Sequence, residues 1–101
     1  MIKNSLTILT TFKNDWDDLK KTIISIKSQS FTNWNHIIID ASTTIGQDNS
    51  FFEEYKKDKR VNWILKKNMS QYEAYNLAIS YVNYGFFQIL NSGTTYYNDE
   101  L

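Results

Sequence analysis

The stretch Gly85–Leu90 (GFFQIL), followed by Asn91–Thr94 (NSGT), decides the fold of this chain. Mostly apolar residues after a glycine are typical of a buried strand, and here a polar turn follows its carboxyl end. In open α/β sheets, ligands bind at that end because the loops after several strands converge on one crevice. We therefore expect the upstream chain to build a sheet around this strand and to place a ligand site near the turn.

Three upstream segments have the composition of strands. Leu6–Phe12 is apolar and β-branched, and Trp34–Ile39 contains a run of isoleucines that ends at Asp40. Val61–Leu65 is shorter, which favours an edge position in the sheet. With the stretch at 85–90, the sequence predicts four strands.

Helical patterns lie between these strands. The first helix has one apolar stripe at i, i+3, i+7 and i+10, formed by Trp16, Leu19, Ile23 and Ile26. Asn14 is the expected N-cap of this helix, and polar residues 28–30 are expected to end it. A short second helix is marked by Phe51, Phe52 and Tyr55, and it ends within the charged run 53–60.

The third predicted helix repeats the stripe spacing with Tyr72, Tyr75, Ile79 and Val82. Ala74 and Ala78 allow close approach to the sheet, and Gly85 stands where a left-handed C-cap is expected. Strands that alternate with helices imply a parallel sheet with right-handed crossovers. We predict one domain over residues 1–101, an α/β fold of the Rossmann-like type: a three-layer α/β/α sandwich with a mostly parallel four-stranded sheet.

Composition excludes several classes of function. Eleven basic and eleven acidic side chains give no net charge, so no overall field favours nucleic acid or an anionic membrane. The absence of cysteine removes disulfides and thiolate metal sites. No apolar run approaches the roughly 18 residues that a membrane span needs. We expect a soluble, intracellular chain.

Polar residues gather at the predicted strand ends: Thr11 and Asn14 after the first strand, Asp40 after the second, and Asn91–Gly93 after the fourth. The start of the third helix, residues 70–76, faces the same crevice, where its N–H groups could receive a phosphate. Asp40 is the strongest candidate, because a carboxylate after a run of isoleucines is costly to bury without a partner. Polar strand-end loops are equally consistent with a structural role.

The remaining polar features favour structural interpretations. His36 lies within a strand, and a structural or surface role is expected for it. The basic runs 56–60 and 66–67 alternate with acidic and aromatic residues, which indicates a solvated face rather than a nucleic-acid site.

Five segments, taken in order, resemble the N-terminal, donor-binding half of family 2, GT-A type glycosyltransferases. They are Leu6–Asn14, Leu19–Phe31, Ile37–Thr44, Tyr72–Ile79 and Gly85–Gly93, and together they cover nearly the whole chain. The resemblance implies a hexosyltransferase-like enzyme with a nucleotide-sugar pocket. It also implies that the acceptor-binding half, which holds the family's catalytic base, is missing from this sequence, so no catalytic residue is assigned.

The resemblance assigns roles within that pocket. Thr11 and Phe12 would wall the nucleoside, Asp40 would read the base, typically a uracil imide, and Tyr72 with Asn76 would line the diphosphate side. The nucleotide-sugar-binding residues expected on this basis are Thr11, Phe12, Asn14, Asp40, Tyr72, Asn76, Asn91, Ser92 and Gly93.

The turn Asn91–Thr94 occupies the place of the family's Asp-x-Asp motif. In that motif, carboxylates hold Mg²⁺ or Mn²⁺ against the donor diphosphate. Here the motif position reads Asn91–Thr94, and Thr94 stands where some relatives keep a carboxylate. Neutral amide and hydroxyl oxygens are weak ligands for these cations, so we assign no metal ligand in this chain.

The leading hypothesis is therefore the UDP-sugar-binding half of an inverting glycosyltransferase for surface polysaccharide. It would work in the cytoplasm or at the inner face of the membrane, as a homo-oligomer or with a C-terminal half. The alternative is a non-catalytic α/β binding or interaction module that has lost the metal site. A flavodoxin-like receiver fits the alternation but lacks the acidic cluster and lysine that such a site requires.

Overall fold

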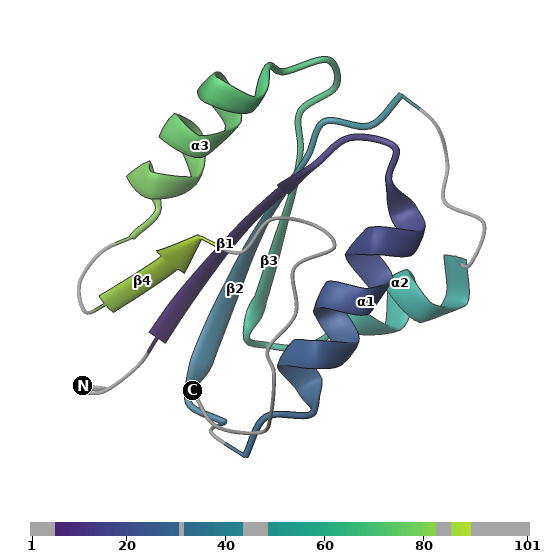
Figure 1. Cartoon of the computed structure of the whole chain (residues 1–101), viewed down its shortest axis with the longest axis vertical. Helices are drawn as coiled ribbons and strands as arrows, with labels where there is room; N and C mark the ends of the chain where they lie inside the picture. The colour runs from purple at the N-terminus through teal and green to yellow at the C-terminus, as the bar shows by residue number, and fades with distance from the viewer. Residues whose placement is uncertain (1–5, 31, 44–48, 83–85, 90–101) are drawn as a thin grey trace.

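The computed structural model describes residues 6–30, 32–43, 49–82 and 86–89, and Figure 1 shows their arrangement. The elements in chain order are β1 (Leu6–Phe12), α1 (Trp16–Lys27), β2 (Trp34–Asp40), α2 (Asn49–Lys56), β3 (Val61–Leu65), α3 (Gln71–Ser80) and β4 (Phe86–Ile89). The predicted alternation of strands and helices is confirmed. None of the helices described in these residues is long and apolar enough to cross a membrane.

The four strands form one parallel sheet in the order β3-β2-β1-β4. The register sets Phe12 opposite Asp40 and Asp40 opposite Leu65, so β1, β2 and β3 finish level with one another. β3 lies at an edge, as its length predicted. After β3 the chain returns across the sheet to β4 beside β1, which makes the β1/β4 boundary the topological switch point.

Helices cover both faces of the sheet (Figure 1), so the predicted three-layer sandwich is confirmed. α1 and α2 pack on one face, through Ile8, Phe12, Leu19, Ile23, Ile26, Trp34, Ile38, Phe52 and Tyr55. α3 packs on the other face, through Leu9, Ile37, Ile39, Ala74 and Ala78. Alternate residues of β1 and β2 thus enter opposite cores, as a parallel sheet that is covered twice requires.

The apolar stripe of α1 is confirmed, since Leu19, Ile23 and Ile26 are fully buried. The prediction of Asn14 as the N-cap is wrong by one residue. Asp15 is the N-cap, while Asn14 adopts a left-handed backbone conformation with φ 65°. Asp15 has a negative φ of -96°, whereas Asn14 turns the chain between β1 and the helix.

The predicted stripe of α3 is wrong. Tyr72 is 78% exposed and Ile79 is 41% exposed, whereas Ala74 and Ala78 are buried against the sheet. Small side chains let the helix backbone approach the strands closely, so the alanines, rather than the tyrosines, define the packed face. Val82 does pack beside this core, and α3 ends at Ser80 with Tyr81 as the C-cap, while the predicted cap Gly85 lies outside the described residues.

Of the two roles expected for His36, structural or surface, the structure shows the structural one. Its Nε2 lies 2.8 Å from Thr10 Oγ1 and its Nδ1 lies 2.7 Å from Tyr55 Oη, so one hydrogen-bonded chain links β1, β2 and α2. All three side chains are buried. Burial lowers the pKa of His36 to about 3 and raises the pKa of Tyr55, so both groups are neutral at pH 7.

Candidate functional site

A cavity of about 440 Å³ lies at the carboxyl end of β1. It is lined by Thr11, Phe12, Lys13, Asp15, Ala41, Met69, Ser70, Gln71 and Ala74. These residues come from the end of β1 and its connection to α1, from the residue after β2, and from the connection into the first turn of α3. The cavity therefore has the position that the strand pattern predicted for a ligand site, and its size is within the usual range for small-molecule pockets.

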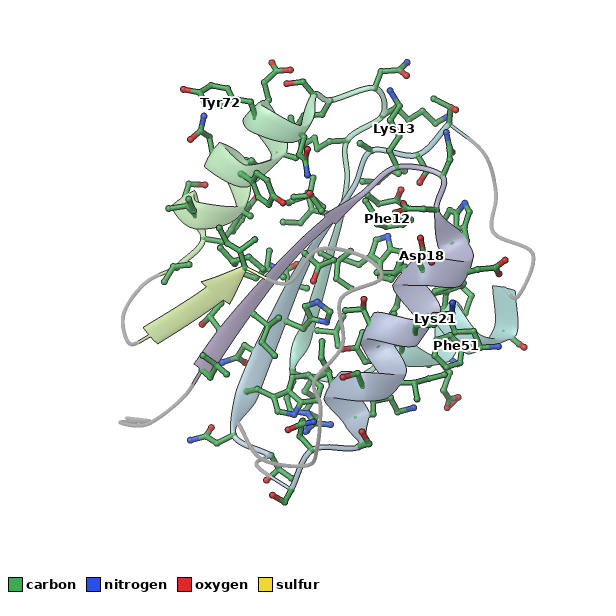
Figure 2. The ribbon with its side chains drawn as sticks, viewed as in Figure 1. Phe12, Lys13, Asp18, Lys21, Phe51 and Tyr72 are labelled. Carbon is green, nitrogen blue, oxygen red and sulfur yellow. The ribbon has the colours of Figure 1, made fainter. Side chains whose placement is uncertain are left out.

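Two charged side chains stand in the lining, Lys13 and Asp15. The backbone N–H of Lys13 donates to Asp15 Oδ1 at 3.1 Å, which places the carboxylate over the turn that carries the lysine. Figure 2 shows Lys13 and Tyr72 at the same end of the molecule, with Tyr72 on α3. The sequence pattern did not single out Lys13 or Asp15, although both follow directly on the Thr11–Phe12 pair.

Phe12 lines the cavity, while its ring belongs to the core on the α1/α2 face. Its ring makes edge contacts with Trp16 at 4.8 Å and with Trp63 at 5.7 Å between centroids. Trp16 and Trp63 stack on each other. Because Phe12 is only 4% exposed, the position of its ring is set by packing in the core.

Asp40 is buried but does not line the cavity. Its Oδ1 accepts the backbone N–H of Ser42 at 2.9 Å, and its Oδ2 accepts the indole N–H of Trp63 at 3.1 Å. This buried carboxylate thus has hydrogen-bond partners within the chain. A contact between Asp40 and a base stays a prediction.

Asn14 links the loops that follow β1 and β2. Its backbone N–H donates to Ser42 Oγ at 2.9 Å. Its side-chain Oδ1 accepts the N–H of Thr43 at 3.0 Å, and its Nδ2 donates to Thr43 Oγ1 at 3.2 Å. Asn14 lies between two lining residues without lining the cavity itself.

The start of α3 is closed by a capping box. Ser70 Oγ accepts the N–H of Glu73, and the Glu73 carboxylate accepts the N–H and the hydroxyl of Ser70. The Ser70 hydrogen bonds lower the pKa of Glu73. A phosphate at this helix start would therefore approach a carboxylate, which weakens the sequence-based expectation of a phosphate site here. The Ser-x-x-Glu spacing is the signal that predicts this cap.

The other expected residues are placed as follows. Thr11 and Phe12 line the cavity, whereas Tyr72 and Asn76 do not. Both lie on the exposed surface of α3, one and five residues beyond Gln71, which does line it. Asn91, Ser92 and Gly93 lie outside the described residues.

Metal ligands are sparse in the described part of the chain. Residues 6–30, 32–43, 49–82 and 86–89 contain no group of three or more His, Cys, Asp or Glu that could hold a metal ion. The cavity lining supplies one carboxylate, Asp15, beside one ammonium group, Lys13. Mg²⁺ and Mn²⁺ need several oxygen ligands, so these lining residues do not fit a divalent cation, and we derive no step through one.

Comparison with known proteins finds likeness in structure alone. No protein-family model matches the sequence, and no curated protein matches it. The mannosyltransferase PcManGT from Pyrobaculum calidifontis, solved with GDP-Man and Mn²⁺, superposes with a TM-score of 0.80 at 13% identity over 97% of this chain. S. aureus TarS 1-349 with UDP gives 0.75 at 15% over 98%, and with UDP-GlcNAc 0.71 at 14% over 91%.

These neighbours are GT-A-like glycosyltransferases, and the chain has their Rossmann-like fold, as the sequence resemblance predicted. The chain spans 30% of the mannosyltransferase and 29% of TarS 1-349 with UDP. At this level of identity the likeness establishes the fold, and the role of the cavity has to be argued from its own residues.

Proposed function

We propose that this chain is the donor-binding part of a glycosyltransferase and that it binds a nucleotide-diphosphate sugar in the cavity at the end of β1. One observation carries the proposal: the cavity lies at the carboxyl end of the parallel sheet, beside the end of β1, the residue after β2 and the start of α3, in a chain with the GT-A fold. In open α/β sheets this is the place where ligands bind. The neighbours solved with GDP-Man, UDP and UDP-GlcNAc support a nucleotide sugar as the ligand class.

The lining residues suit the parts of such a ligand. Thr11 and Phe12 line the side of the cavity at the end of β1, where a nucleoside would lie against them. Lys13 supplies a cation that would offset the charge of the diphosphate, and it does so at an exposed rim where the side chain can move onto the ligand. Ser70 and Gln71 line the α3 side, where the Ser70 hydroxyl belongs to the capping box and the Gln71 amide donates to Tyr75.

The finer parts of the proposal are supported by the sequence resemblance alone. They are a UDP-sugar as donor, hexosyl transfer to a polysaccharide or glycan acceptor, a cytoplasmic location, and assembly as a homo-oligomer or with a C-terminal half. The same resemblance is the only support for a contact from Asp40 to the base. It is also the only support for contacts to the donor from Tyr72, Asn76 and residues 91–93. Since the described lining offers a single carboxylate, we propose that binding by this chain does not depend on Mn²⁺.

The test is calorimetric titration of the chain with UDP, GDP, UDP-GlcNAc and GDP-mannose, with and without Mn²⁺. Lys13→Glu places a negative charge at the cavity rim. It should weaken nucleotide affinity about tenfold, equivalent to about 1.4 kcal/mol, because a diphosphate then meets a like charge. Lys21→Glu is the matched control, since it makes the same charge change on the exposed side of α1 (Figure 2) and should leave affinity unchanged.

Each outcome of the titration separates the proposed function from a different alternative. Equal loss of affinity in both variants would mean that only net charge matters, and the cavity would lose its assigned role. Lack of affinity for every nucleotide in the wild-type chain would contradict the proposal and favour the alternative, a non-catalytic interaction module. Tight binding only with Mn²⁺ would show that metal ligands exist beyond the described lining.

A further inference from the structure

We infer that Asn14 is a positioning residue: it holds Lys13 and Asp15 at the cavity rim by tying the β1–α1 connection to the residues after β2. This inference rests on the proposed function. It assigns Asn14 a role different from direct contact with the nucleotide, since Asn14 is not among the residues that line the cavity.

The left-handed backbone conformation of Asn14 makes a turn between β1 and α1, so Lys13 and Asp15 lie outside both elements. Asn14 has φ 65°, one of two non-glycine residues with positive φ in the described chain. Asparagine tolerates this conformation better than most residues because its short polar side chain bonds locally. The turn that results ends β1 at Phe12 and starts α1 after Asp15, so that the residues on both sides of Asn14 reach the cavity.

Three hydrogen bonds hold this turn to a loop 28 and 29 residues away in sequence, through Ser42 and Thr43. That loop is itself anchored, because the N–H of Ser42 donates to the buried Asp40 carboxylate, which also accepts from Trp63. A continuous set of contacts therefore runs from the core to the cavity rim. A rim held in place before binding lowers the entropy that a ligand must overcome.

A purely structural role predicts a different result. Asn14 and Thr43 are both exposed, and hydrogen bonds between exposed groups add little to global stability. If the contacts serve the cavity, removing them should weaken nucleotide binding much more than it lowers the unfolding midpoint. Affinity and stability are therefore measured separately on each variant.

Two substitutions separate the effect of the backbone conformation of Asn14 from the effect of its side-chain amide. Asn14→Gly keeps the left-handed conformation and removes the side chain. Asn14→Asp restores an acceptor for the Thr43 N–H, and the Thr43 hydroxyl can rotate to donate to the second oxygen. Asn68→Gly is the matched control, because Asn68 has φ 62° and its described hydrogen bond, from its N–H to Ala41 O, is one that glycine retains.

The measurements are amide hydrogen exchange at Thr43, thermal unfolding, and calorimetric titration with UDP and with GDP. In Asn14→Gly, exchange at Thr43 should accelerate about tenfold and nucleotide affinity should fall about tenfold, with an unfolding midpoint close to that of the wild type. Asn14→Asp should restore slow exchange at Thr43, whereas its added negative charge beside Lys13 keeps nucleotide affinity below that of the wild type. Asn68→Gly should change neither exchange at Thr43 nor affinity.

Unchanged affinity in Asn14→Gly, with a wild type that binds, would overturn the inference and leave the proposed function standing. Loss of affinity that follows an equal loss of stability would also overturn it, since that is the result of a structural role. A wild-type chain with no affinity for UDP or GDP would overturn the proposed function and this inference together.

Discussion

At the scale of single residues, β2 buries two polar side chains in two different ways. Asp40 keeps a carboxylate in the interior because a backbone N–H and an indole N–H donate to it. His36 is buried as a neutral ring, held between two hydroxyl groups. Both solutions need partners from other elements: Trp63 from β3 for the aspartate, and Thr10 with Tyr55 for the histidine.

The histidine gives a prediction about pH. In the folded chain the pKa of His36 is lowered to about 3 by burial, whereas in the unfolded chain it is about 6.5. The unfolded state therefore binds more protons between these values, and stability is lost as pH falls below about 6.5. Between pH 7 and pH 5 the free energy of unfolding should decrease by up to about 2 kcal/mol from this group.

Urea unfolding at several pH values checks this expectation. His36→Gln, which cannot titrate but can still donate and accept, should show a weaker pH dependence above pH 5 than the wild type. The same pH dependence in both proteins would contradict the account. If the variant does not fold, the imidazole C–H signal of wild-type His36 gives the answer instead, since it should not titrate between about pH 8 and pH 5.

Residue-level predictions from sequence succeeded where local physics decides and failed where the partner comes from elsewhere. A structural role for His36 was one of the two roles expected from its place in an isoleucine-rich strand, and its burial was not predicted. The need for a partner at Asp40 was evident, but its identity depended on the pairing of β2 with β3. The N-cap at Asn14 failed because Ser42 and Thr43, far away in sequence, compete for its backbone and side chain.

At the scale of elements, the strands were predicted best. The bounds of β1 and β3 agree with the prediction, and β2 extends one residue further, to Asp40. Strand composition is a local signal. On α3 the predicted close approach of Ala74 and Ala78 to the sheet is confirmed. The apolar stripe through Tyr72 and Ile79 is wrong, because the nearness of the sheet favours the small side chains.

The packed face of α3 can be tested by substitution. Ala78 is fully buried against the sheet, so Ala78→Leu should overpack that face and lower the free energy of unfolding by about 1–3 kcal/mol. Ile79→Ala removes a larger side chain from the exposed side and should cost about 0.5 kcal/mol or less. Urea unfolding measures both. A larger loss for Ile79→Ala than for Ala78→Leu would restore the stripe that the spacing predicted.

At the scale of the whole molecule, the alternation of strands and helices was enough to predict a doubly covered parallel sheet, and a cavity lies at the end of the sheet where the site was expected. The superposition with PcManGT at 13% identity shows why. The fold depends on apolar pattern and topology, which many sequences satisfy. The cavity lining was predicted only in part, since Lys13, Asp15 and Ala41 are brought together with the start of α3 by tertiary structure.

The central claim is that a nucleotide sugar binds in this cavity, and amide chemical-shift mapping during titration with UDP and with GDP tests it most directly. The account predicts that shifts appear together at Thr11, Lys13, Ala41 and Gln71, which belong to three separate segments that meet at the cavity. Arg60, before the amino end of β3, should not respond. Shifts centred on Arg60, or none at millimolar nucleotide, would contradict the account.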